Sequence, residues 1–254
     1  MLFLSDPKKK AQEQLELTRE LASTVGLQIN VGKTKQFIIN INDPKPLKVG
    51  AEDIEIVKDF KYLGSLVASS ENDFMHRKSL AWGAFWKMES IWRSTSTETW
   101  LKVRIYQASV LSILLYGSET WILSHSLLKA LDVFCMSCYR IMTGVKRLDH
   151  VTNKHVYSTV KQNPLSTTVA RRQLRWVGHM LRRDVSEPIN KYALYEPPDH
   201  LGSKKCGRQP LSFVSQVAKL ISNNFQLSAN EISKAAQDRK EWRRLVTACV
   251  PEIT

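Results

Sequence analysis

The chain has 254 residues, of which 43% are hydrophobic and 24% charged, a balance typical of a globular protein with one domain or two small ones. Its net charge of +13 favours contact with a polyanion such as DNA or RNA. Four cysteines exclude a disulfide framework and fit an intracellular protein of the cytoplasm or nucleus, and no apolar run is long enough to cross a membrane.

The first 70 residues have the pattern of a small α/β region. A helix is predicted from the capping residue Asp6 to Gly26, because apolar residues recur at helical spacing between them. Apolar residues on both sides of Gly32 predict two short strands around a turn. Residues 54–67 predict a further strand or hairpin pair with its bend at Gly64.

Helical periodicity dominates the remainder of the chain. The predicted helices are Phe74–Trp92, Glu98–Tyr116, Leu127–Thr143, Val169–Arg183, Leu211–Asn224 and Ala229–Ala248. Ser228 and Glu231 have the spacing of a capping box before the last of them. Residues 186–209 hold three of the nine prolines and are predicted to be an exposed linker. The predicted fold class is therefore α+β and mostly α.

Basic residues are concentrated between Arg140 and Arg208, where 14 basic residues face 5 acidic ones and leave +9 of the total charge. One predicted helix there carries the candidate nucleic-acid-binding residues Arg171, Arg172, Arg175, Trp176, Arg182 and Arg183. Arg171, Arg175 and Arg182 recur at helical spacing, so their guanidinium groups can follow a phosphate track on one face. A solvated basic face is the alternative, and Trp176 either packs in the core or stacks on a base.

Cys135 and Cys138, followed by His150 and His155, approach the spacing of a zinc finger. A finger of this kind requires its cysteines on a hairpin, whereas these two fall on the apolar stripe of a predicted helix. We therefore expect two buried structural thiols and no metal site.

Five segments match, in order and at about the same spacing, motifs of one family. They are GLQINVGKTK, FKYLGSLV, LSILLYGSETW, RRQLRWVGHMLRRD and AQDRKEWRRLV. The family is that of LINE-type (non-LTR) retrotransposon reverse transcriptases. The chain resembles the C-terminal part of such an endonuclease–reverse transcriptase polyprotein.

This resemblance implies an architecture in three parts. Residues 1–70 correspond to a partial palm, with one helix, a few antiparallel strands and a primer-grip hairpin. Residues 71–145 correspond to a helical thumb, and residues 146–254 to a basic helical C-terminal region that includes the linker.

The same resemblance assigns roles to residues of the palm-like part. Lys33 and Lys35 would lie near the incoming nucleoside triphosphate, with exposed turn lysines as the alternative. The primer grip would be formed by Phe60, Tyr62, Leu63 and Gly64.

Catalysis is not expected from this chain. In the family an aromatic-Ala-Asp-Asp loop precedes the segment that corresponds to Leu2–Ser5, and no Asp-Asp pair occurs among the 254 residues. Nucleotide addition needs two Mg²⁺ ions held by carboxylates, so the chain would carry no cofactor, although the intact family uses Mg²⁺. The interpretation is a truncated reverse-transcriptase-derived protein that binds RNA, DNA or an RNA–DNA hybrid without reading sequence.

Three alternatives remain open at this point. The chain is a relic that acts as a helical protein-interaction module, a poorly folding product, or an incomplete version of an active enzyme. Salt-sensitive binding of nucleic acid distinguishes the main interpretation from the first two.

We predict that the purified chain does not extend a primer on a template in the presence of nucleotides and Mg²⁺ or Mn²⁺. The reason is that the metal-binding aspartates of the family have no counterpart in it. Extension that co-purifies with the chain, and that survives replacement of Asp6, would contradict this expectation.

Overall fold

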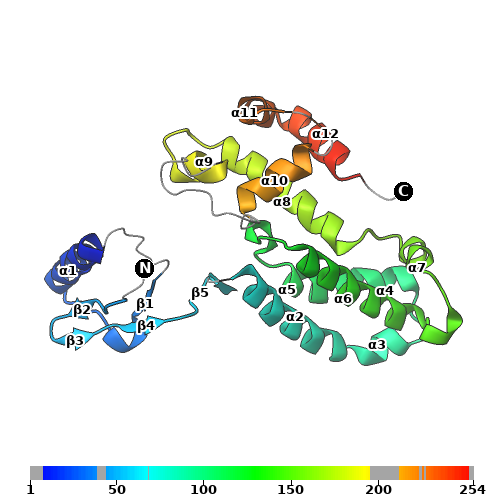
Figure 1. The fold of residues 1–254 in the computed structure, drawn as a ribbon. Helices are drawn as coiled ribbons and strands as arrows, with labels where there is room; N and C mark the ends of the chain where they lie inside the picture. The colour runs from blue at the N-terminus through cyan, green and yellow to red at the C-terminus, as the bar shows by residue number, and fades with distance from the viewer. Residues whose placement is uncertain are drawn as a thin grey trace, which may run out of the picture. The chain divides into compact units, whose positions relative to one another are not determined.

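The computed structural model describes residues 8–38, 44–67, 69–194, 212–222, 225 and 227–251. The chain divides into two compact units, residues 1–69 and 70–254, and each is described by itself (Figure 1). Helices dominate and the strands are short, which confirms the mostly helical α+β class. In the described ranges, no helix has the length and hydropathy needed to cross a membrane.

The first unit contains one long helix and three small pairs of strands. Its elements are α1 (Lys8–Thr24), a 3₁₀ turn η1 (Val31–Lys33), β1 (Lys35–Phe37), β2 (Lys48–Val49), β3 (Glu52–Asp53), β4 (Glu55–Val57), β5 (Lys61–Tyr62) and β6 (Ser65–Leu66). Strand β1 pairs with β4 in parallel, whereas β2–β3 and β5–β6 are antiparallel. The helix is fastened to β2 by Gln12, whose amide donates to the Lys48 carbonyl and accepts from the Lys48 N–H.

The strands differ from the prediction around Gly32. Residues 27–30 form no strand, because the side chain of Asn30 accepts a hydrogen bond from Lys33 N (3.0 Å) and caps a 3₁₀ turn instead. The prediction of two strands around this turn is therefore wrong. Only β1 follows the turn, and it pairs in parallel with β4 rather than forming the expected antiparallel arrangement. The predicted cap Asp6 lies outside the described residues.

The predicted bend at Gly64 is confirmed. Strands β5 and β6 form a hairpin whose two turn residues, Leu63 (φ 47°) and Gly64 (φ 90°), both have left-handed backbone angles. Two such residues in succession are characteristic of the tight turns that match the twist of hairpin strands.

The second unit is entirely helical in its described part. Its α-helices are α2 (Ser70–Trp86), α3 (Glu89–Arg93), α4 (Thr99–Tyr106), α5 (Ser112–Leu114), α6 (His125–Thr143), α7 (Asn153–Val160), α8 (Leu165–Leu181), α9 (Pro188–Ala193), α10 (Phe213–Ser222), α11 (Ala229–Gln237) and α12 (Arg239–Cys249). A π-helical turn η2 (Gln107–Leu111) joins α4 to α5, and the 3₁₀ turns are η3 (Ser118–Thr120) and η4 (Arg147–Asp149). The predicted helices are thus present, but three of them are interrupted, and α7 and α9 were not predicted.

The break in the last predicted helix has a clear physical cause. Asp238 has an extended backbone, and its carboxylate accepts hydrogen bonds from Lys240 N (2.7 Å) and Glu241 N (3.3 Å). It therefore ends α11 and caps a new helix, α12.

The predicted capping box of Ser228 and Glu231 at the start of α11 is confirmed. Within the expected linker, residues 188–193 form α9, and Ala193 is buried.

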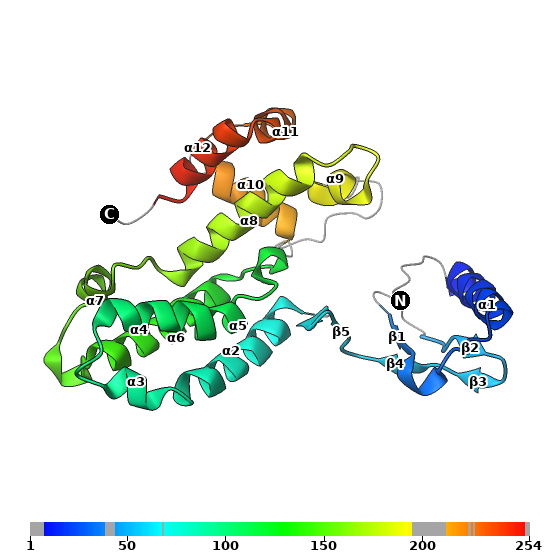
Figure 2. The same cartoon turned by 180° about the vertical axis from the view of Figure 1, so that it is seen from behind.

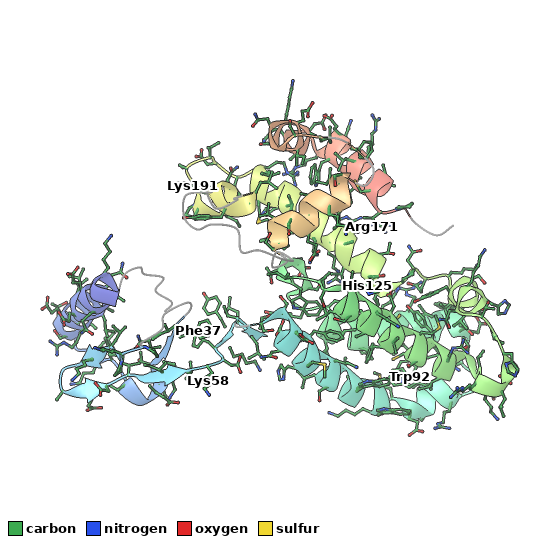
Figure 3. All side chains as sticks on the ribbon, in the orientation of Figure 1. Phe37, Lys58, Trp92, His125, Arg171 and Lys191 are labelled. Atoms are coloured by element: carbon green, nitrogen blue, oxygen red, sulfur yellow. The ribbon has the colours of Figure 1, made fainter. Side chains whose placement is uncertain are left out.

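Two hydrophobic cores lie on opposite sides of α8. The first is built by α2–α7 and the start of α8 and contains Trp92 and Trp121, and Figure 3 shows Trp92 within this group of helices. The second is built by the remainder of α8 with α9–α12 and contains Leu174, Val177 and Trp242. In both views α8 runs between α6 on one side and α10 and α12 on the other (Figures 1 and 2).

Gln173 fixes α8 against the first core. Its side chain is completely buried, and its amide donates to the carbonyl of Ser118 (3.2 Å) and to that of Trp121 (2.7 Å). Its own oxygen accepts from Gln216 of α10 (2.6 Å), and the Gln216 oxygen accepts from Leu123 N (2.6 Å). Buried Gln173 and half-buried Gln216 therefore link α8 to α10 and to the segment before α6.

Trp242 of α12 packs on the opposite side of α8. Its indole is 3% exposed, and its Nε1 donates a hydrogen bond to the Leu174 carbonyl (3.0 Å). The ring occupies the space beside Gly178, where an added Cβ would lie only 2.1 Å from Nε1. Gly178 is therefore required for its lack of a side chain, which allows α12 to approach the backbone of α8.

We predict that Gly178→Ala destabilises the second unit by about 2 kcal/mol or more, because the methyl group displaces Trp242 and its hydrogen bond. Denaturant unfolding followed by tryptophan fluorescence measures the change. Gly83→Ala is the matched control. Gly83 is an exposed residue of α2 with no atom within 4 Å of an added Cβ, so this change should add about 0.5–1 kcal/mol of stability. Equal effects of the two substitutions would contradict the role of Gly178.

Candidate nucleic-acid interface

The arginines of the predicted binding helix point to different surroundings. Arg171 donates from Nη2 to the Val250 carbonyl (2.9 Å) near the end of α12. Arg172 donates from Nη1 to the Leu115 carbonyl (3.1 Å) and lies 3.6 Å from the Glu119 carboxylate. Both guanidinium groups therefore connect α8 to neighbouring elements, and that of Arg172 also has a carboxylate close by.

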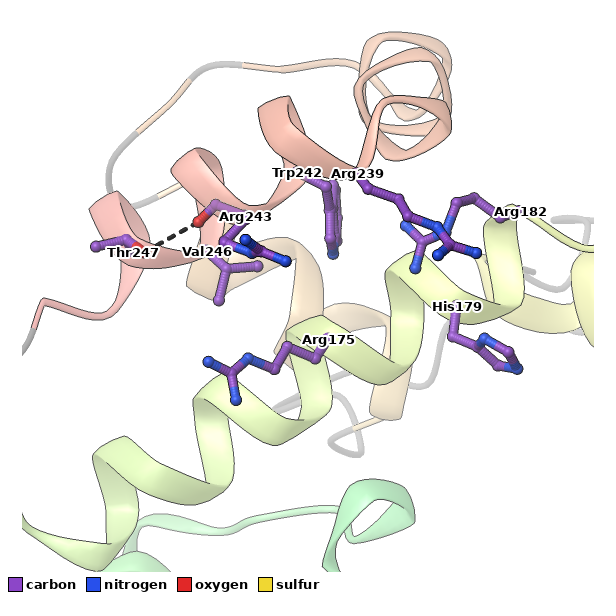
Figure 4. A pocket seen from close by; sticks show the side chains of 8 residues that line it. All are labelled: Arg175, His179, Arg182, Arg239, Trp242, Arg243, Val246 and Thr247. Carbon is purple, nitrogen blue, oxygen red and sulfur yellow. Dashed lines mark hydrogen bonds between the residues drawn. The ribbon is translucent and has the colours of Figure 1, made fainter.

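Arg175 and Arg182 face a pocket of about 520 Å³ between α8 and α12. The pocket is lined by Arg175, His179 and Arg182 from the first helix and its C-terminal end, and by Arg239, Trp242, Arg243, Val246 and Thr247 from the second. Figure 4 shows side chains of the two helices converging, with Arg182 beside Arg239 and Trp242 pointing toward α8. We call this site the arginine pocket.

The arginine pocket has no compensating negative charge. None of the residues that line it is acidic. In the part of the chain that the structure describes, none of its four guanidinium groups is within ion-pair distance of a carboxylate. Burial and the nearby charge of Arg239 lower the pKa of Arg182. Like charges held together in this way attract anions, and guanidinium groups bind phosphate oxygens in pairs.

Arg182 is oriented by a backbone contact. Its Nη1 donates to the carbonyl of Ala236 (2.9 Å), one of the last carbonyls of α11. A cation at the C-terminal end of a helix is favoured by the helix dipole. Arg175, Arg239 and Arg243 are instead exposed, so a ligand in solvent can reach them.

Trp176 and Arg183 are placed differently again. Trp176 is half-buried against the second core and stacks on His179, with 5.5 Å between ring centroids. Part of the ring therefore packs against the second core, and its stacking on a base stays a prediction. Arg183 is exposed and does not line the arginine pocket.

The palm-like residues belong to the first unit, whereas the residues of the arginine pocket belong to the second. Lys33 is exposed in the turn η1, and Lys35 forms an ion pair with Glu55 across the β1–β4 pair. The expected primer-grip residues occupy the β5–β6 hairpin, where Phe60 is half-buried and Tyr62 and Leu63 are exposed. Gly64 supplies the second residue of the hairpin turn. Their roles toward nucleotide and primer stay predictions.

Sequence reasoning missed Arg239 and Arg243. The segment that contains them had been used only as a family motif, although their i, i+4 spacing repeats the signal that singled out Arg171 and Arg175. The unpredicted break at Asp238 also matters for the site, because Asp238 starts the helix that carries both arginines.

The fold and the site define a mostly helical protein with a small α/β unit and an arginine pocket in its C-terminal part. One curated relative is the transposon-derived protein F52C9.6 of Caenorhabditis elegans, which is 26% identical over 263 aligned residues, 97% of this chain and 92% of the relative. This similarity over nearly the whole length supports a transposon origin for the chain. No family model and no solved structure matches it.

The two cysteines of the zinc-finger-like spacing are buried on α6. Cys135 and Cys138 are both 0% exposed, as predicted from the apolar stripe of the helix. Burial raises the pKa of the Cys135 thiol to about 12 and raises that of Cys138 as well. Within the described ranges, no group of three or more His, Cys, Asp or Glu residues is arranged to hold a metal ion.

We predict that iodoacetamide labels Cys135 and Cys138 of the folded protein only through unfolding, with mass spectrometry identifying the labelled residues. An unfolded thiol ionises near its ordinary pKa of 9.0, whereas the folded Cys135 thiol stays protonated until about 12. Folding therefore loses stability as the pH rises from about 9 toward 12. Of the three cysteines in the described ranges, half-exposed Cys249 should react first. Rapid labelling of Cys138 at pH 8 in the folded protein would contradict the prediction.

Proposed function

We propose that this chain is a nucleic-acid-binding protein derived from the reverse transcriptase of a LINE-type retrotransposon. The arginine pocket is the single observation that carries the binding proposal, because two helices bring four arginines together without an acidic partner. The ligand would be the phosphates of RNA, DNA or an RNA–DNA hybrid. Contacts of this kind position a strand and do not read its sequence.

The charge around the pocket supports the same proposal. Helix α8 carries three arginines and no acidic residue, and α12 carries four basic residues against Glu241 alone. Each arginine that neutralises a phosphate releases a condensed counterion, which makes binding strongly dependent on salt.

The reverse-transcriptase origin rests on different support. The five ordered motifs resemble that family, and the worm relative is transposon-derived. The β5–β6 hairpin fits a primer grip, whereas the parallel β1–β4 pair departs from the antiparallel palm that the resemblance implies. The binding proposal requires no cofactor, and Mg²⁺ belongs to the intact family.

A protein-interaction module is the second candidate, and one observation favours it. Leu17 and Leu21 lie on one face of α1 and Val25 follows its last residue, and they are 57%, 60% and 70% exposed. An apolar face of this kind on a helix commonly contacts another surface. A chain that binds no nucleic acid at low salt would favour this candidate.

We predict that replacing Arg175, Arg239 and Arg243 with alanine flattens the dependence of log K on log salt concentration by roughly 2–3 units on duplex DNA, since each phosphate contact contributes about 0.9. Fluorescence anisotropy between about 0.05 and 0.3 M salt measures the slope, and the loss should be similar on unrelated sequences.

The matched control removes three charges outside the pocket, with Arg183, Lys240 and Arg244 replaced by alanine. All three are exposed, so the fold should tolerate the change and the slope should stay near that of the unmodified chain. Arg171→Ala is a second control and should reduce stability by about 1 kcal/mol through the lost contact with Val250, with little effect on the slope. Equal slopes for the two triple variants would contradict binding through the arginine pocket.

A further inference from the structure

The arginine pocket concentrates more positive charge than one internal phosphate of a strand requires. An internal phosphodiester carries a single negative charge, whereas a terminal phosphomonoester carries about 1.5 to 2 at neutral pH. Four arginines line this one hollow, and no acidic side chain is among the residues around it. The charge therefore matches a dianion better than a monoanion.

The shape of the pocket also favours an end over a continuous backbone. The arginines surround a hollow of about 520 Å³, within the range of pockets that enclose small ligands. Trp242 and Val246 are the apolar residues among those that line it. A terminal nucleotide can enter such a hollow, whereas an internal phosphate is carried past it by the strand on both sides.

We propose that the arginine pocket binds the terminal phosphomonoester of a nucleic-acid strand. This inference rests on the nucleic-acid binding proposed above and names the part of the strand that the site recognises.

The arrangement of the arginines gives each a part in binding. Arg182 is held by its bond to the Ala236 carbonyl, so part of its fork is oriented before the ligand arrives. Exposed Arg239 and Arg243 approach from α12, and Arg175 lies across from them on α8 (Figure 4). Paired N–H groups from these side chains match the three oxygens of a monoester. The repulsion and burial that lower the pKa of Arg182 are offset when a dianion enters.

The test compares three single strands of one sequence that carry the same internal dye. One has a 5′-phosphate, one a 3′-phosphate and one hydroxyl groups at both ends. At about 0.15 M salt we expect at least one phosphorylated strand to bind about tenfold more tightly than the hydroxyl strand, as one additional charge-assisted contact would give.

Variants on a single helix locate the effect. The double substitution Arg239→Ala and Arg243→Ala should abolish the advantage of the phosphorylated strand. Its matched control, Lys240→Ala with Arg244→Ala, removes the same charge from exposed positions of α12 outside the pocket and should retain the advantage. Circular dichroism before binding checks that both variants stay helical.

The outcomes separate this inference from the proposed function. Failure of all three strands to bind would overturn both. Equal binding of the three strands, with a salt slope that still depends on the pocket, would overturn only the terminal-phosphate assignment. An advantage that survives the Arg239 and Arg243 variant would place end recognition elsewhere and would also overturn it.

Competition distinguishes a strand end from a free nucleotide. Adenosine monophosphate should displace the phosphorylated strand only at concentrations far above the dissociation constant of the strand, because it lacks the remaining phosphate contacts. Displacement at equal concentration would make a free phosphomonoester the ligand and would contradict the assignment to a strand.

Discussion

The indole of Trp242 lies against α8 at Gly178 and donates its N–H to the Leu174 carbonyl. Arg175 and Arg182 are three residues before and four residues after Gly178, so they flank this contact on the same helical face. On α12, Arg239 lies three residues before Trp242 and Arg243 directly after it, and both line the arginine pocket. The packing that holds the two helices together therefore also sets the four arginines opposite one another.

In this arrangement, stabilising apolar packing lies next to a cluster of like charges. The buried indole and the apolar residues around it stabilise the second core. Burial of Arg182 and the nearby charge of Arg239 lower the pKa of Arg182, so the charged form is disfavoured at this position. Under the proposed function a bound anion would offset this effect, and its binding would then stabilise the folded region. On its other side, α8 is held by the hydrogen bonds of Gln173 to the Ser118 carbonyl and to Gln216 of α10.

The arginines of the predicted binding helix have different surroundings, so a cluster of charge in a sequence does not by itself locate a binding surface. Arg171 donates to a carbonyl directly after α12, and Arg172 to a carbonyl directly after α5. Arg175 and Arg182 face the pocket. Helical spacing gives the direction of each side chain around α8, and the neighbours that pack there decide whether it meets a carbonyl or solvent.

The sequence by itself determined the mostly helical class, the hairpin bend at Gly64, the capping box at Ser228 and the burial of Cys135 and Cys138, because each follows from local spacing. It did not determine the parallel pairing of β1 with β4, or the junction of α8 with α12, since both join segments far apart in the chain. The arginine pocket belongs to the second kind. Its residues come from two helices more than 50 positions apart, and only tertiary packing decides which side chains converge.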